Sequence, residues 1–176
     1  MPFIPHPEAG EYAPYYGKYI AQLPANADIL MLLREQASAT AKLLATAGES
    51  PAEHRYADGK WSVKEVVGHL SDAERVFSYR ALWFARADPS ELPGFDENAW
   101  IPVAGFGART LADVAAELAA VRAATIALFA SLDDAALLRS GRANAQPVSV
   151  RALAAILAGH ERHHVTLLRE RYGLAG

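Results

Sequence analysis

Ten prolines divide this chain of 176 residues into segments that can form long helices and segments that cannot. Proline lacks the backbone N–H and clashes with the preceding turn, so a long helix rarely continues through it. Four long windows without proline remain, and each carries apolar residues at the three- and four-residue spacing of an amphipathic helix. The pattern therefore predicts an all-α protein, a four-helix bundle.

Capping residues give approximate bounds to the four predicted helices. Ser62 and Glu65 fit a capping box, which places the start of the second helix at Ser62. Ser149 is the expected N-cap of the fourth helix, and Gly48 is the expected stop of the first. The predicted helices span about 26–47, 62–87, 110–132 and 149–172. The residues expected in the core include Leu33, Leu70, Phe77, Leu118 and Leu153.

The connections between the predicted helices differ in length and composition. The first and third are short, and no alternating pattern of apolar and polar residues predicts a strand or a hairpin. The second, Asp88–Arg109, is rich in proline, glycine and aromatic residues and is long enough to cross a bundle from end to end. We expect it to be an ordered segment packed on the bundle, either as a plain crossover or as a wall that faces a substrate.

Residues 1–25 form an arm in front of the first predicted helix. The arm carries Tyr12, Tyr15, Tyr16 and Tyr19, which makes it too aromatic for a solvated tail. It is therefore predicted to pack on the helical bundle of residues 26–172, or on a second subunit. Because the chain has no domain linker and no low-complexity segment, residues 1–176 are predicted to form a single domain.

Composition excludes several classes of function. A net charge of −3 supplies no basic field, which argues against nucleic acid as a partner. The absence of cysteine excludes disulfides, thiolate metal ligands and a cysteine nucleophile. No apolar run approaches the roughly 20 residues that span a bilayer, and the N-terminus does not resemble a signal peptide. The expected location is therefore the cytoplasm, with no membrane partner.

Two of the six histidines lie on one face of the fourth predicted helix. His160 and His164 are one turn apart and share that face with apolar residues such as Leu157. A single buried histidine is more often a hydrogen-bonded core residue than a metal ligand. Burying two imidazoles together, however, costs desolvation and invites repulsion when either is protonated. The pair therefore favours a metal ion held from one helix.

His69 in the second predicted helix is the expected third ligand. Gly68 and Gly159 are the two glycines inside the predicted helices, and each directly precedes a candidate ligand, His69 or His160. Glycine inside a helix costs about 1 kcal/mol relative to alanine, so we expect these two to let neighbouring helices approach closely. The predicted site is one divalent transition metal ion on His69, His160 and His164. Imidazole suits Zn, Ni, Cu or Fe, with Zn or Ni expected first, and three ligands leave positions open for a substrate.

The segment from His160 to His164 also matches the H-E-x-x-H signature of zinc metalloproteases. Such enzymes take a third ligand downstream, where Glu170 is the sole candidate, and no edge strand is available to hold a peptide. Outside that interpretation, Glu161 is expected to be a surface carboxylate, a residue that orients a ligand, or a general base for hydrolysis. His163 faces away from His160 and is excluded from the ligand set.

The chain resembles the DinB/YfiT-like superfamily over nearly its whole length. The matching segments are 12–16, 19–20, 59–69, 74–77, 93–98, 149–151 and 159–164. The resemblance implies a four-helix bundle with a crossover between the second and third helices, often assembled as a homodimer. It also implies a three-histidine metal site, which maps onto His69, His160 and His164. Characterised members include S-transferases that use bacillithiol or mycothiol and a mycothiol-dependent isomerase, whereas others are labelled metal-dependent hydrolases.

Three functions follow as expectations. The first is a metal-dependent enzyme that transfers a low-molecular-weight thiol of the bacillithiol type to a small electrophile; the thiol must be brought in, because the chain has no cysteine. The second is a metal-dependent hydrolase in which the metal activates water. The third is a non-catalytic, metal-stabilised binding or dimerisation module. Open coordination positions favour an enzyme, whereas a position filled by the protein itself favours the module. The sequence assigns no catalytic residue beyond the metal ligands.

Overall fold

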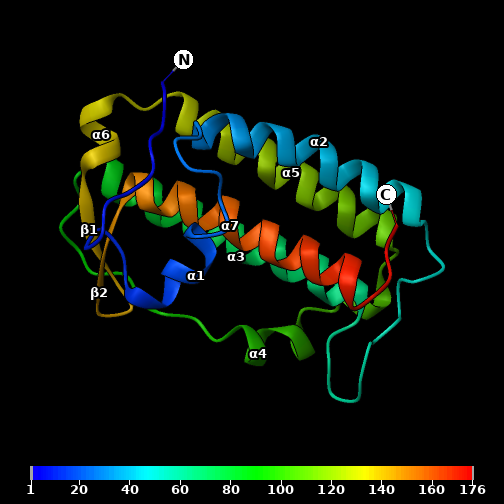
Figure 1. The fold of residues 1–176 in the computed structure, drawn as a ribbon. Coiled ribbons are helices and arrows are strands. Elements are labelled where there is room, and N and C mark those ends of the chain that lie inside the picture. Colours follow the sequence, from blue (N-terminus) through cyan, green and yellow to red (C-terminus); the bar gives the residue numbers. More distant parts are fainter. Residues whose placement is uncertain (1, 176) are drawn as a thin grey trace.

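Four long helices form a bundle in the computed structural model, which describes residues 2–175 (Figure 1). They are α2 (Ile29–Ala47), α3 (Val63–Ala85), α5 (Leu111–Ala130) and α7 (Val150–Glu170). α2 and α3 each pack against both α5 and α7. The colours of Figure 1 show that α2 and α7 run in one direction and that α3 and α5 run in the other. The predicted fold class is confirmed.

Side-chain caps start all four long helices, and two of these caps, Ser62 and Ser149, were predicted. The Ser62 side chain accepts from the Glu65 N–H, and the Glu65 carboxylate accepts from the Ser62 N–H, so the capping box forms. α2 starts at Ile29 rather than near residue 26, because the Asp28 side chain caps it and Asn26 has a left-handed φ of 62°. Ser149 caps α7, as predicted, and Thr110 caps α5. α3 and α5 end at Ala85 and Ala130, two residues earlier than predicted in each case.

The connection between α5 and α7 differs from the prediction of a short loop without strands. It contains α6 (Asp134–Leu138) and an antiparallel hairpin of β1 (Ser140–Ala143) and β2 (Gln146–Ser149). Asn144 and Ala145 both have positive φ, 53° and 59°, as a type I′ turn requires. The usual sequence signal of that turn is Asn-Gly. Alanine in place of glycine, and strands of only four residues, hid the hairpin from the sequence.

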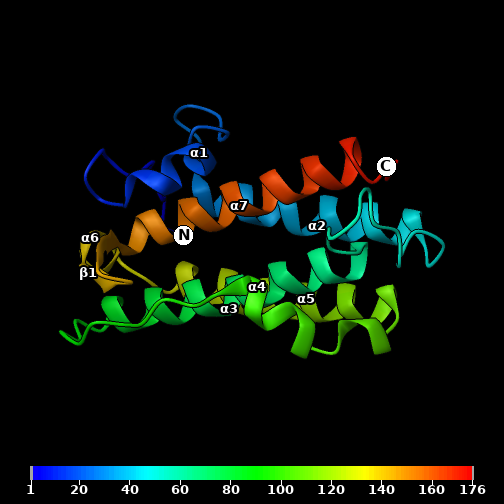
Figure 2. The ribbon, with the colours of Figure 1, turned by 90° about the horizontal axis from the view of Figure 1, so that it is seen from below.

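A long crossover carries the chain from the end of α3 back to the start of α5, as predicted. Figures 1 and 2 show it running along the bundle through α4 (Glu97–Trp100), and two 3₁₀ turns follow, η2 (Ile101–Val103) and η3 (Phe106–Ala108). At its start, the Leu92 N–H donates to the Arg142 carbonyl of the hairpin at 3.0 Å. Near its end, Ile101 and Phe106 are buried against the bundle. The segment is therefore ordered and packed, in agreement with the expectation.

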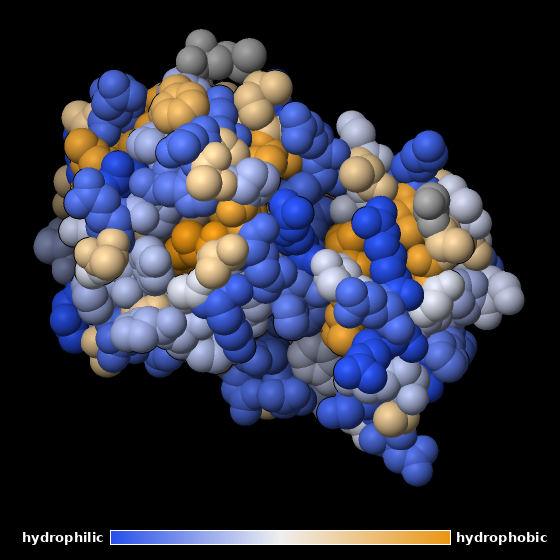
Figure 3. Space-filling model, in the orientation of Figure 1, coloured by the Kyte–Doolittle hydropathy of each residue, from blue (hydrophilic) through white to orange (hydrophobic). Residues whose placement is uncertain are grey.

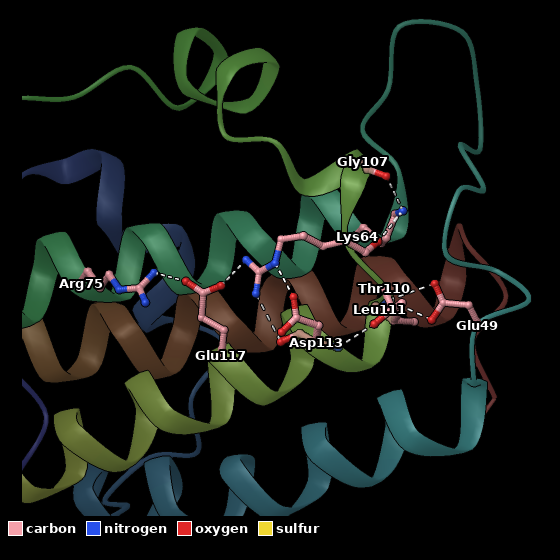
Figure 4. A network of polar contacts seen from close by, with 9 residues as sticks. Glu49, Lys64, Arg75, Gly107, Thr110, Leu111, Asp113 and Glu117 are labelled. Carbon is pink, nitrogen blue, oxygen red and sulfur yellow. Dashed lines mark hydrogen bonds and ion pairs between the residues drawn. The ribbon is translucent and has the colours of Figure 1, made fainter.

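Polar contacts fasten the last part of the crossover to α3 and α5 (Figure 4). The Lys64 ammonium is buried and donates to the carbonyl oxygens of Gly107 at 3.0 Å and of Arg109 at 2.8 Å. Glu117 of α5 pairs with both Arg109 and Arg75, and the latter belongs to α3. These contacts tie together two helices that run in the same direction and have no tight turn between them.

The core consists of two apolar clusters at the two ends of the bundle. All five of the predicted core residues named above are buried. Figure 3 shows a mostly hydrophilic face with hydrophobic residues in separate patches. Within residues 2–175, no helix is both long enough and apolar enough to cross a bilayer.

Candidate metal centre

The bundle brings the three predicted ligands together. His69 comes from α3, and His160 and His164 lie one turn apart on α7. The Nε2 atom of His160 lies 3.1 Å from Nε2 of His69 and 3.1 Å from Nε2 of His164. All three ligand nitrogens fall within 4.8 Å of one another, and they form the one group of this kind among the described residues.

The spacing of the three nitrogens fits a metal ion. An ion with bonds of about 2.0–2.1 Å to nitrogen holds neighbouring ligand atoms roughly 3 Å apart. The observed separations of 3.1 Å agree with this geometry. Hydrogen bonding alone accounts for the arrangement poorly, because the single Nε2 position of His160 would have to serve two neighbours at once. The three histidines therefore fit the divalent metal ion that the sequence predicts.

Burial keeps the three imidazoles neutral. Loss of hydration lowers the pKa of His69 to about 4. The same effect, with smaller electrostatic contributions from His69, His163 and Lys18, lowers the pKa of His164 to about 3. Burial likewise lowers the pKa of His160 well below its ordinary value. Metal ligation requires neutral imidazole, so the folded chain holds the ligands in the state that binds a metal.

Aromatic side chains from three different segments surround the ligands. The Trp61 ring, just before α3, lies 4.9 Å from the His69 ring. The centre of the Tyr19 ring, in the arm, lies 5.4 Å from the centre of the His160 ring. The centre of the Phe77 ring, in α3, lies 6.4 Å from the same point. These contacts limit the orientations that the imidazole rings can adopt. They also make the arm part of the site, which α1 (Gly17–Ile20) achieves by packing on α7.

The two helical glycines have a different structural role from the predicted one. A Cβ atom on Gly159 would stand 2.4 Å from the backbone oxygen of Tyr19. A Cβ atom on Gly68 would stand 2.4 Å from the Phe106 ring. Gly159 therefore lets the arm pack directly on α7, and Gly68 lets the crossover pack directly on α3. Neither glycine lies at a contact between α3 and α7.

Gly159→Ala is expected to destabilise the protein by about 1–3 kcal/mol, the usual cost of overpacking. Alanine is the better helix former by about 1 kcal/mol, so a net loss reports the clash with Tyr19. Urea unfolding measures the effect. Gly107→Ala is the control, since a Cβ there meets nothing within 4 Å. If Gly159→Ala proves as stable as the control, the arm is not fixed against α7 as described.

A cavity of about 620 Å³ opens beside the histidines. His69, His160 and His164 lie in its wall. The arm, the crossover and the hairpin complete the wall through residues that include Tyr15, Tyr16, Tyr19, Phe95, Glu97 and Asn144. Its volume lies within the range of roughly 300–1,000 Å³ that small-molecule sites occupy. Of the two expectations for the crossover, the structure favours the substrate-facing wall.

Glu161 is neither a surface carboxylate nor a group that orients a ligand. Its side chain is buried, and its Oε2 lies 2.5 Å from Nη1 of Arg122. Its Oε1 accepts a hydrogen bond of 2.5 Å from the Thr40 hydroxyl. Both carboxylate oxygens are thus committed to an ion-pair network that also includes Glu74. Because His69 upstream supplies the third nitrogen and Glu161 is engaged elsewhere, the metalloprotease interpretation of H-E-x-x-H is wrong.

His163 stays outside the ligand cluster, as predicted. Its ring lies 5.5 Å from the Tyr19 ring and 5.1 Å from the His164 ring, and it lines the cavity. It is partly exposed, and partial burial lowers its pKa. His163 is therefore placed to contact a small molecule in the cavity.

Comparison with known proteins gives a consistent picture. A family model described as the DinB superfamily matches residues 32–168. A protein of Geobacillus thermodenitrificans named "Putative metal-dependent hydrolase" is 27% identical over 148 residues, which cover 80% of this chain and 82% of that one. A protein of Geobacillus kaustophilus with the same description is 31% identical over 125 residues, 67% of this chain and 69% of that one.

Two solved structures share the fold. YfiT from Bacillus subtilis, described as a probable metal-dependent hydrolase with an unusual four-helix bundle topology, superposes with a TM-score of 0.71 at 21% identity, covering 96% of this chain and 94% of that one. A mycothiol-dependent maleylpyruvate isomerase superposes with a TM-score of 0.66 at 13% identity, covering 83% of this chain and 61% of that one. At these identities the likeness is one of fold.

Proposed function

The chain belongs to the DinB superfamily, and on that premise we propose that it is a metal-dependent enzyme acting on a small molecule in the cavity beside His69, His160 and His164. The observation that carries this proposal is the position of the three converging imidazoles in the cavity wall, with no fourth protein ligand among residues 2–175. Open coordination positions that face a cavity favour an enzyme over a metal-stabilised module. The names of both curated relatives support metal dependence. The ion would be a divalent transition metal, Zn or Ni first.

The reaction we propose is transfer of a low-molecular-weight thiol of the bacillithiol type to an electrophile. When bound, the ion would supply a Lewis acid that lowers the pKa of a coordinated thiol or water. A thiol, with an ordinary pKa of about 8.5, needs far less help from a protein base than water does. This matters here because Glu161 is committed to Arg122 and Thr40. One structural neighbour is a mycothiol-dependent isomerase, which also supports a thiol as co-substrate.

The chain's own contribution to this chemistry is to bind and orient the reactants. Burial raises the pKa of the Tyr19 hydroxyl above its ordinary value, so it stays protonated and remains a hydrogen-bond donor. The Tyr15 hydroxyl lies 3.5 Å from it in the same wall. Phe77, Phe95 and Trp61 line the cavity with apolar surface, which limits the access of water to the reacting groups.

A hydrolase is the second candidate, favoured by the names of the two relatives. Hydrolysis at neutral pH gains from a carboxylate that accepts a proton from water. Glu97 is the one carboxylate among the residues that line the cavity within 2–175. It is therefore the residue that separates the two reactions experimentally.

The test is an assay of the Zn- or Ni-loaded protein with thiols and electrophiles. Thiol transfer predicts that thiol and electrophile are consumed one for one, with no turnover when thiol is omitted. Glu97→Gln should then change the rate only a few-fold, as should the control Glu170→Gln, which alters an exposed carboxylate outside the cavity. Thiol-free hydrolysis that falls by about 10²-fold or more in Glu97→Gln, the usual loss for a missing general base, would overturn thiol transfer in favour of hydrolysis.

A further inference from the structure

A buried arginine lines the same cavity as the histidines. Arg80 is 4% exposed and lies three turns along α3 from His69, on the face that also carries Phe77. Its guanidinium carbon stands 5.5 Å from the Phe77 ring, which itself lies 6.4 Å from the His160 ring. One aromatic side chain therefore separates this cation from a predicted metal ligand.

Arg80 has no carboxylate partner within residues 2–175. One of its N–H groups donates to the Pro93 carbonyl at 2.7 Å, the Tyr16 hydroxyl is its other polar neighbour, and the Phe77 and Phe95 rings face it. Arg122, the other deeply buried arginine, shows what burial ordinarily requires, because it pairs with two carboxylates. A guanidinium has five donor hydrogens, so Arg80 keeps donors for a ligand.

An unpaired buried cation is costly to maintain. Removing a charge from water costs several kcal/mol unless an opposite charge compensates. Burial accordingly lowers the pKa of the Arg80 guanidinium, although it stays protonated at neutral pH. The cost calls for a compensating anion that arrives with a ligand, because the cavity is open to one.

The other charged groups of the cavity do not supply that anion. Glu97 is the one carboxylate in the described wall, and it is not among the groups that act on the Arg80 guanidinium. Its charge acts on the arm, where burial is the main cause of the raised pKa of Tyr19 and Glu97 adds to it. The histidines are neutral, and a bound divalent ion would add further positive charge. The cavity therefore presents a cation at Arg80 and, with metal, a second one at the histidines.

We propose that Arg80 binds a carboxylate or similar oxyanion of the substrate, while the reacting end of the same molecule lies at His69, His160 and His164. The assignment of the reacting end rests on the proposed function; the anion site stands on the burial and lack of partner of Arg80. The substrate class is then a small organic acid whose anionic group and reacting group are separated by an apolar portion that passes Phe77. The planar guanidinium suits two parallel hydrogen bonds to a carboxylate.

Calorimetric titration of the metal-free protein with hexanoate and hexanamide tests the anion site without any reaction and without carboxylate binding to a metal ion. These probes have the same length and differ in charge. Hexanoate is expected to bind at least about tenfold more tightly, the equivalent of one charge-assisted hydrogen bond. Arg80→Met should abolish this preference, while Arg86→Met, which removes an exposed charge from the end of the same helix, should retain it. A preference that persists in Arg80→Met, or hexanoate that does not bind at all, would overturn the proposal.

Two further measurements keep the result decisive. Arg80→Lys preserves the charge and loses the planar pair of donors, so it should keep part of the preference even if Arg80→Met fails to fold. A lysine variant that folds and shows no preference contradicts the site. The Co(II)-loaded protein with 6-mercaptohexanoate reports separately, through its absorption bands, whether sulfur reaches the metal. If carboxylate preference depends on Arg80 and sulfur does not bind, the anion site holds and the thiol-transfer proposal fails.

Discussion

Arg122→Met is expected to lower the free energy of unfolding by about 3–5 kcal/mol, because it leaves two carboxylates buried without a counter-ion. The Arg122 guanidinium is 3% exposed and reaches Glu74 through two contacts of 2.7 Å and Glu161 through one of 2.5 Å. Thr40 completes the network by donating to Glu161. Each of the four long helices supplies one member, so a single substitution disturbs all of them.

The position of the network explains why the effect should be large. It lies midway along the helices, between the apolar cluster that contains Phe77 and Phe129 and the one that contains Leu70 and Leu118. Water cannot easily reach the carboxylates there to replace Arg122, and they must either remain charged without a partner or take up protons. Since Glu161 directly follows His160 in α7, the network also holds the helices that carry the ligands in register.

Urea unfolding at neutral pH and constant metal concentration measures the loss. Arg75→Met is the matched control, because Arg75 pairs with Glu117 at a half-exposed position where such contacts contribute about 0–1 kcal/mol. A second variant, Arg122→Met with Glu74→Gln and Glu161→Gln, removes the stranded charges and should recover part of the stability. If Arg122→Met lies within 1 kcal/mol of the control, the network is hydrated and not buried as described.

Local signals explain which parts of the fold could be predicted. Helix bounds follow from caps and periodicity, and the Ser62 capping box and the Ser149 cap are contacts within three residues, so the sequence contains them. The crossover could be predicted because proline and glycine exclude a long helix there. The hairpin could not, because its turn at Asn144 and Ala145 lacks the glycine that normally marks it and is held by contacts with Leu92, more than 50 residues earlier.

The predicted metal ligands could be found from local sequence signals, whereas the ion-pair network could not. His160 and His164 are neighbours in sequence, and His69 was indicated by its glycine, although that glycine serves contact with Phe106. Arg122 pairs with Glu74 and Glu161, which lie 48 and 39 positions away in the sequence, so no local signal identifies these partners. A signal was nevertheless present, because position 122 follows Leu118 by four residues on the buried face of the helix. A charged residue there should have indicated a buried partner on another helix.

The largest expected effect on metal binding comes from His160→Ala. His160 is the central residue of the predicted site, because its Nε2 lies 3.1 Å from each of the other two nitrogens. The remaining pair would come from two helices with no central nitrogen between them. Losing a hydrogen bond to a metal ligand weakens metal binding by 10–100-fold, so losing the ligand itself should weaken it by about 10²-fold or more. Under the proposed function, enzymatic activity should be lost in parallel, whether the reaction is thiol transfer or hydrolysis.

Competition with a chelator, followed by elemental analysis, measures the change relative to the unaltered protein, for which we expect about one ion per chain. His163→Ala is the control, because His163 lies in the same helix and lines the same cavity but stays outside the cluster of nitrogens. It should retain the metal while altering substrate binding. His164→Ala should also lose most of the metal. Retention of a full equivalent of metal by the variant that lacks all three histidines would show that the ion binds elsewhere, and the convergence of the imidazoles would then need another explanation.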